Sequence, residues 1–109
     1  MKFAVFFTFK PETIAGMMER PADRRAVVSR SAEEAGGTLD TMYYMFGAQD
    51  GFVIFDAPDS ETAAAVSLAV SSTGAFTHLE THELISPEDM QGILERAKRV
   101  RGSYVPPGA

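Results

Sequence analysis

The segment from Met42 to Glu83 constrains the fold of this 109-residue chain more than any other part of the sequence. It reads as a strand, a turn over Gly47–Gly51, a second strand, an alanine-rich helix and a further strand. The Asp-Gly step of the turn favours a hairpin between the first two strands. Pro58 to Glu61 starts the helix, because Asp59 or Ser60 can cap its first amides. This order of elements defines a fold better than it defines a reaction.

Three elements are expected ahead of this segment. The residues from Phe3 to Phe9 are apolar on both alternating faces, which is typical of a central strand covered on both sides. We expect a loop with a short helical turn from Pro11 to Arg20. A helix is predicted from about Pro21 to Ala35, where Gly36-Gly37 ends it.

The strand boundaries follow from alternation and turns. Strict alternation along the strand predicted over Thr38–Phe46 puts Leu39 and Met42 on opposite faces. The third strand is expected over Gly51–Phe55 and the fourth over Ala75–Leu84. Both faces of the strand over Thr38–Phe46 carry large apolar side chains.

A final helix is predicted over residues 86–101. Ser86 supplies a capping hydroxyl and Pro87 a first-turn proline. The apolar stripe of this helix comprises Met90, Ile93, Leu94, Ala97 and Val100. It can pack on its own subunit or on a partner, and the sequence leaves both open. Residues 1–102 then form one domain, followed by a tail over 103–109.

The predicted order β-α-β-β-α-β-α fits an α+β fold, namely a ferredoxin-like βαββαβ domain with an additional C-terminal helix. Such a sheet carries helices on one face only. Because the strands are apolar on both faces, a second copy of the chain is the economical cover for the other face.

The same segment resembles the GYD domain family of small bacterial proteins. The resemblance rests on Gly47-Ala48-Gln49-Asp50, on Phe52 to Asp59, on the alanine-rich helix and on Gly74-Ala75-Phe76, and it covers roughly Met1 to Asp89. It implies a ferredoxin-like subunit that dimerises into a dimeric α+β barrel, in a family of largely undefined activity. Gln49 stands where the family has its tyrosine, so the role of that tyrosine cannot be carried over.

Composition excludes several classes of function. Ten basic residues against fifteen acidic ones give a net charge of -5, which disfavours nucleic acid as a partner. The absence of cysteine excludes disulfides and thiolate chemistry. No apolar run approaches the roughly 18 residues that span a bilayer. The short N-terminal apolar run does not fit a signal peptide, so a cytoplasmic protein is expected. No phosphate-binding or dinucleotide fingerprint is present.

Polar side chains alternate along the fourth strand. His78, Glu80 and His82 share one face of it, because alternate residues of a strand point the same way. Imidazole and carboxylate groups suit a transition metal such as Zn, Fe or Ni. The two histidines start roughly 13 Å apart, so a metal needs Glu80 with one histidine and further ligands. The candidates for those ligands are Asp40, Asp56 and Glu83. No other cofactor is predicted.

An aromatic cavity is the other candidate site. Phe7, Tyr43, Tyr44 and Phe52 are the predicted ligand-binding residues, with His78 or His82 as an acid or base near neutral pH. Rim candidates are Ile14–Met18 and Ser71–Thr73. Other dimeric α+β barrel families include cofactor-independent oxygenases and small cyclases, so analogy at the level of the fold adds these two activities as candidates.

The cluster of Arg20, Arg24 and Arg25 is a further candidate. It can hold an anion, but a solvated helix face with acidic partners explains it better. Three hypotheses therefore remain for the chain: a homodimeric barrel that binds a small apolar or aromatic molecule, with or without enzymatic activity; a metal-binding version of it; and a structural or regulatory dimer.

Overall fold

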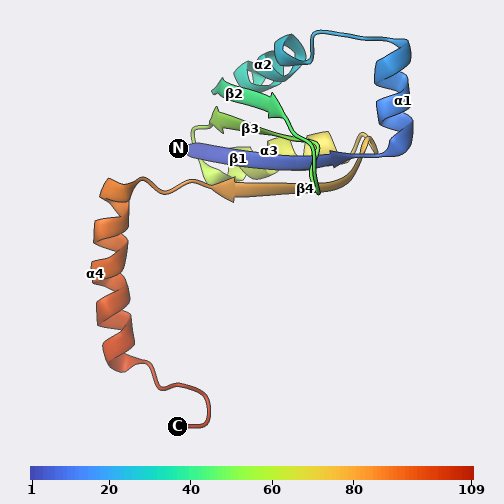
Figure 1. Ribbon diagram of the computed structural model, residues 1–109. Coiled ribbons are helices and arrows are strands. Elements are labelled where there is room, and N and C mark those ends of the chain that lie inside the picture. The colour runs from blue at the N-terminus through green and yellow to red at the C-terminus, as the bar shows by residue number, and fades with distance from the viewer.

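The computed structural model describes residues 1–109 and contains a four-stranded antiparallel sheet with the strand order β2-β3-β1-β4 (Figure 1). The mixed α+β, ferredoxin-like fold predicted from the sequence is confirmed. The elements are β1 Lys2–Phe9, α1 Pro11–Glu19, α2 Arg24–Glu34, β2 Thr38–Tyr44, β3 Gly51–Asp56, α3 Ser60–Ser71, β4 Phe76–Glu83 and α4 Pro87–Ser103.

The segment after β1 is a regular helix, α1, where a loop with a short turn was predicted. Pro11 occupies its first turn, where a missing amide hydrogen costs nothing. The Thr13 hydroxyl donates to the carbonyl of Ala75 at 2.7 Å, which ties the helix to the start of β4. The next helix, α2, begins at Arg24 and not at Pro21, because Asp23 caps it through the Ala26 amide at 3.1 Å.

A β-bulge in β2 overturns the predicted alternation. The register shifts between Leu39 and Thr41, so that Leu39 lies opposite Phe55 and Met42 lies opposite Val53. Leu39 and Met42 therefore face the same side of the sheet. An extra residue in one strand has this effect. The strand also ends at Tyr44, two residues before the predicted Phe46.

The hydrophobic core lies on the face of the sheet that α2 and α3 cover. It consists of Phe3, Val5, Phe7, Met42, Val53, Phe55, Ala57 and Ala63. Ala63 is 1% exposed, and its small side chain lets α3 lie close to the strands. Asp59 caps α3 by accepting from the Thr62 amide at 2.7 Å, as the sequence predicted for Asp59 or Ser60.

The opposite face of the sheet has no helix over it. We call it the open face; its central apolar side chains are Phe6, Tyr43, Phe52 and Ile54. The Phe6 and Phe52 rings are 5.8 Å apart between centroids, and those of Tyr43 and Phe52 are 5.9 Å apart. The predicted apolar character of both faces is therefore present.

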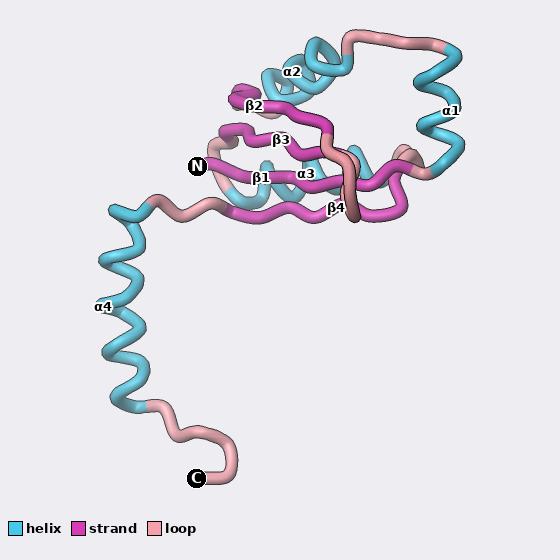
Figure 2. Tube along the Cα trace, in the orientation of Figure 1, coloured by secondary structure: helices cyan, strands magenta, loops and turns pink.

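The C-terminal helix α4 extends away from the rest of the molecule (Figures 1 and 2). Every residue from His82 to Ala109 is exposed. The principal extents are 58 × 34 × 23 Å, and the radius of gyration is 17.8 Å, against about 13 Å for a compact chain of this length. Ser86 caps α4 as predicted, and the helix continues to Ser103, beyond the predicted residue 101. The helix does not pack on its own subunit. No helix of the structure has both the length and the apolar character that crossing a membrane requires.

Candidate functional site

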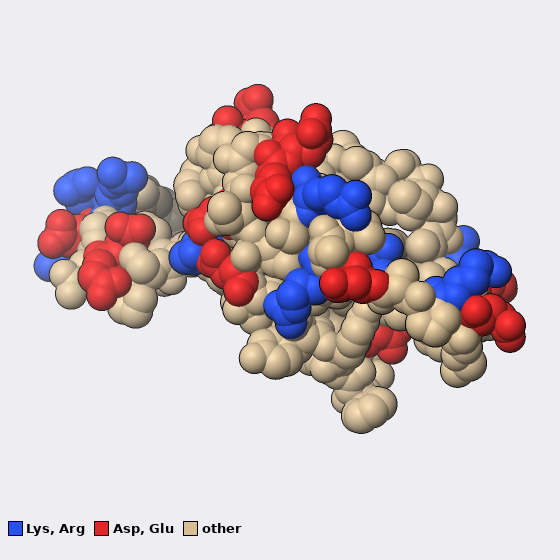
Figure 3. Space-filling model, turned by 90° about the horizontal axis from the view of Figure 1, so that it is seen from above, with Lys and Arg blue, Asp and Glu red and all other residues tan.

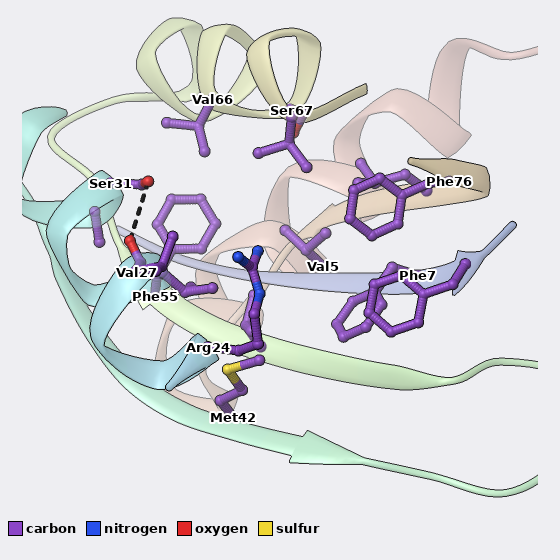
Figure 4. Close-up of a pocket in the computed structure, with 16 residues that line it drawn as sticks. Val5, Phe7, Arg24, Val27, Ser31, Met42, Phe55, Val66, Ser67 and Phe76 are labelled. Carbon is purple, nitrogen blue, oxygen red and sulfur yellow. Dashed lines mark hydrogen bonds between the residues drawn. The ribbon is translucent and has the colours of Figure 1, made fainter. Parts of the chain in front are cut away.

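A cavity of about 130 Å³ lies between the helix-covered face of the sheet, α2 and α3 (Figure 4). Thirteen of its sixteen lining residues are hydrophobic. Val66 and Val70, one helical turn apart, line it from α3, and Val27 and Val28 line it from α2. The cavity is thus a mostly apolar space with few polar groups, as is usual for small-molecule sites.

Three phenylalanines, Phe7, Phe9 and Phe76, form part of the cavity wall. Phe9 and Phe76 stack with their centroids 5.3 Å apart, and Phe7 meets Phe76 edge to face at 5.8 Å. Aromatic pairs with these geometries stabilise one another beyond the area that they bury. The three rings therefore form a mutually packed aromatic wall.

The polar groups of the cavity are two serines and one arginine. The Ser31 hydroxyl donates to the carbonyl of Val27 at 3.2 Å. The Ser67 hydroxyl donates to the carbonyl of Ala63 at 3.0 Å and lies 2.5 Å from the Thr81 hydroxyl. Both serines are therefore engaged by the protein itself. Arg24 is the only charged residue of the lining, and its side chain is directed into the cavity from the first turn of α2 (Figure 4).

A wide hollow bounded by α1, α2 and α3 adjoins the cavity. The two share several lining residues, among them Phe9, Arg24 and Val66, so the cavity opens toward this hollow. Both predicted rim segments border it: Gly16 and Met17 of the Ile14–Met18 segment, and Thr73 of the Ser71–Thr73 segment.

The aromatic residues predicted to form one cavity are divided between the two faces of the sheet. Phe7 lines the cavity. Tyr44 lies near it, with its ring 6.5 Å from that of Phe9, but is 53% exposed. Tyr43 and Phe52 lie on the open face. Within one subunit these side chains therefore do not form a single aromatic pocket, because the pairing register of the strands separates them.

The two histidines also lie on the open face, on either side of Glu80. The His78 Nε2 is 2.8 Å from the Glu80 Oε1, and the His82 Nε2 is 3.2 Å from the Glu80 Oε2. These two hydrogen bonds hold the pKa of Glu80 below its usual value, and the bond from His78 has the larger effect. The His82 ring meets the Phe6 ring edge on at 6.0 Å. Neither histidine lines the cavity, so the predicted pairing of a histidine with that site does not occur within one subunit.

The residues of one subunit do not form the metal site that was considered as an alternative. No group of three or more His, Cys, Asp or Glu side chains is placed to hold a metal ion. Both Glu80 oxygens are bonded to imidazoles. Two of the proposed further ligands, Asp40 and Asp56, pair with Lys2 instead. A metal on this strand would therefore need ligands from outside the subunit.

Sequence reasoning missed most of the cavity wall. Arg24 was assigned to a solvated helix face, yet it continues the inward face of α2. The residues Arg24, Val27, Val28 and Ser31 all line the cavity. Their spacing of i, i+3, i+4 and i+7 is that of one helix face, and extending the apolar stripe by one turn would have found Arg24.

Comparison with known proteins adds one structure and one family. Among solved structures, the chain is similar to 5-chloro-2-hydroxyhydroquinone dehydrochlorinase from Burkholderia phenoliruptrix AC1100, in complex with 2,5-dihydroxybenzoquinone. The TM-score is 0.56 at 11% identity, over 81% of this chain and 97% of the other, which shows a shared fold. No curated protein matches in sequence. The GYD domain model matches residues 3–94, most of the length of the chain. The chain therefore belongs to the GYD domain family.

Proposed function

We propose that this protein is a homodimeric α+β barrel that binds a small apolar or aromatic molecule in the cavity between the sheet and its helices. The observation that carries this proposal is the apolar cavity of about 130 Å³ with its phenylalanine wall. An engineered apolar cavity of about 150 Å³ in another protein stays dry and binds benzene. A single aromatic ring is therefore the size of ligand that fits.

The similar solved structure supports a ligand of this kind. That dehydrochlorinase was solved with 2,5-dihydroxybenzoquinone, a molecule with one six-membered ring. Its fold matches most of this chain. A one-ring ligand is thus compatible both with this fold and with the volume of the cavity.

The open face supports the dimer. Phe52 and Ile54 lie on this face without a helix above them, and Tyr43 beside them is 62% exposed. Exposed apolar patches of this kind mark interaction sites. Two copies that join through their open faces would form a barrel of two sheets, in a protein that we place in the cytoplasm.

In such a dimer the histidines lie between the two sheets. Because the sheet separates His78 and His82 from the cavity, catalysis by either one requires the reacting molecule to enter the barrel interior. Enzymatic activity of the oxygenase or cyclase type would therefore use a second compartment. Ligand binding in the cavity does not depend on it.

Ligand binding is tested with toluene, a neutral one-ring probe, and a variant that fills the cavity. Val66 lines the cavity, so the added ring of Val66→Phe would occupy the space of the ligand. We expect toluene to shift the NMR signals of the valine methyl groups in the cavity, and the variant to bind it at least about tenfold more weakly.

The matched control is Leu68→Phe on the same helix. Leu68 is 71% exposed and lines neither the cavity nor the hollow, so this variant should bind like the wild type. Circular dichroism checks that both variants fold. Unchanged toluene binding by a folded Val66→Phe protein, or shifts confined to residues outside the cavity, would show that the proposed site is wrong.

A further inference from the structure

Arg24 stands in an unusual environment for a charged residue. Its side chain is half-buried at the start of α2 and is directed among apolar groups of the cavity wall (Figure 4). It makes no hydrogen bond or ion pair within the protein. The adjacent Arg25 differs, because its Nη2 donates to the carbonyl of Met42 at 3.0 Å. A partly buried charge without a partner is costly, so Arg24 is a group that a ligand can satisfy.

The carboxylates of this region do not neutralise Arg24. None lines the cavity itself. Those of Glu12, Glu34, Asp59 and Glu61 border the outer hollow, and none of them pairs with Arg24. Arg24 lines both spaces, so it lies at the junction between the apolar cavity and the open hollow. A bound molecule can therefore place a ring in the cavity and a charged group at this junction.

We infer that Arg24 selects a one-ring ligand that carries an anionic oxygen group, either a carboxylate or a phenolate. This inference rests on the proposed function and names the class of its ligand. Guanidinium presents donors in a planar fork that matches a carboxylate with two parallel hydrogen bonds. A phenolate accepts from the same donors through one oxygen. The valines and phenylalanines of the cavity hold the ring.

The test compares benzoate with benzamide, which has the same ring and nearly the same shape without the charge. Isothermal titration is carried out on the full-length protein and on Arg24→Met. We expect the wild type to bind benzoate at least about tenfold more tightly than benzamide, since hydrogen bonds to charged groups are the stronger ones. In Arg24→Met we expect benzoate to lose about tenfold or more while benzamide changes by less than about twofold.

Arg30→Met is the matched control. Arg30 lies on the same helix and borders the hollow but not the cavity, and its loss changes the net charge of the chain equally. This variant should bind benzoate like the wild type. An equal loss of benzoate affinity in Arg30→Met would show a general charge effect and overturn the role of Arg24.

The second arm uses 4-nitrophenol, whose phenolate form absorbs visible light. Arg24 should lower the pKa of the bound phenol relative to the free one, and Arg24→Met should remove that difference. Preference for benzoate alone identifies a carboxylate ligand, and preference for the phenolate alone identifies a phenol. Toluene binding without any preference for either anion would refute this inference while leaving the proposed function intact. Failure of toluene and of all three ring probes would refute both.

Discussion

At the scale of single residues, the bridge from Glu80 to two histidines makes a prediction about pH. A glutamate usually has a pKa of about 4.3. Because His78 and His82 donate to its oxygens, the pKa of Glu80 is lowered in the folded protein. The unfolded chain therefore takes up this proton at a higher pH than the folded protein does. Stability that Glu80 contributes above about pH 4.3 is lost as the pH falls through its lowered folded pKa.

The variant Glu80→Gln should remove this contribution. We expect its free energy of unfolding to fall less steeply than that of the wild type between about pH 5 and pH 3. Urea unfolding at a series of pH values and one fixed protein concentration measures the two slopes. The control is Glu83→Gln on the same strand, because the Glu83 side chain makes no ion pair in the structure. Parallel slopes for wild type and Glu80→Gln would contradict the prediction.

Residue patterns predicted neighbours along one strand but not across strands. Alternation alone placed His78, Glu80 and His82 on one face of β4. The same rule could not tell which face of the sheet each strand turns toward the helices, because that depends on register. Phe52 lies opposite Phe6, whereas Phe7 lies opposite Gly51. That register, absent from the sequence pattern, assigns Phe7 to the cavity and Phe52 to the open face.

At the scale of elements, local signals predicted the starts of α3 and α4, whereas features that depend on tertiary contacts were missed. The caps Asp59 and Ser86 act through amides three residues away, so the sequence shows them directly. Helix α1 was missed because its bond from Thr13 to Ala75 joins distant parts of the chain. The bulge between Leu39 and Thr41 was missed because it is a feature of the pairing of β2 with β3, which the pattern of one strand does not contain.

Helix α4 leaves its apolar stripe exposed to solvent. Its apolar residues Ile93, Leu94 and Val100 are 40%, 60% and 64% exposed. Most of the stability of a protein helix comes from packing its apolar face, and this face of α4 is not packed on its own subunit. The C-terminal half of α4 carries four Lys and Arg side chains, whereas the chain as a whole is acidic. Figure 3 shows this helix set apart from the rest of the molecule. We therefore expect a second copy to cover α4.

Hydrogen exchange at two protein concentrations tests this expectation. The amides of α4 should be protected when the protein is dimeric and should exchange rapidly once dilution has produced monomers. Ile93→Asp should weaken dimerisation at least about tenfold, because it places a charge in the apolar stripe. Gln91→Asp introduces the same side chain outside the stripe and should behave like the wild type. Concentration-independent exchange of α4 in a proven dimer would show that this helix is not part of the interface.

At the scale of the whole molecule, the two faces of the sheet differ in what they can bind. One face, together with α2 and α3, bounds the cavity. The other face offers Phe6, Tyr43, Phe52 and Ile54 for contact with a second copy. Because no cavity residue lies on the open face, dimerisation and ligand binding should be separable by mutation.

Ile54→Glu is the variant that separates them. Ile54 is half-buried at the centre of the open face, opposite Ala4 on β1, so a dimer would bury the new carboxylate without a partner. Such a charge costs several kcal/mol, from which we expect dimerisation to weaken by about a hundredfold or more. Light scattering after size-exclusion chromatography should then show a monomer, while Leu68→Glu on the outer side of α3 should remain dimeric.

The folded monomer of Ile54→Glu should still bind toluene within about twofold of the wild type, because Ile54 is not among the sixteen residues that line the cavity. NMR shifts of the cavity valines measure this binding under the conditions in which light scattering establishes the monomer. A persistent dimer would mean that the subunits join through another surface. Loss of toluene binding in a folded monomer would mean that the partner subunit holds the helices α2 and α3 in place, and the two faces of the sheet would then act as one coupled unit.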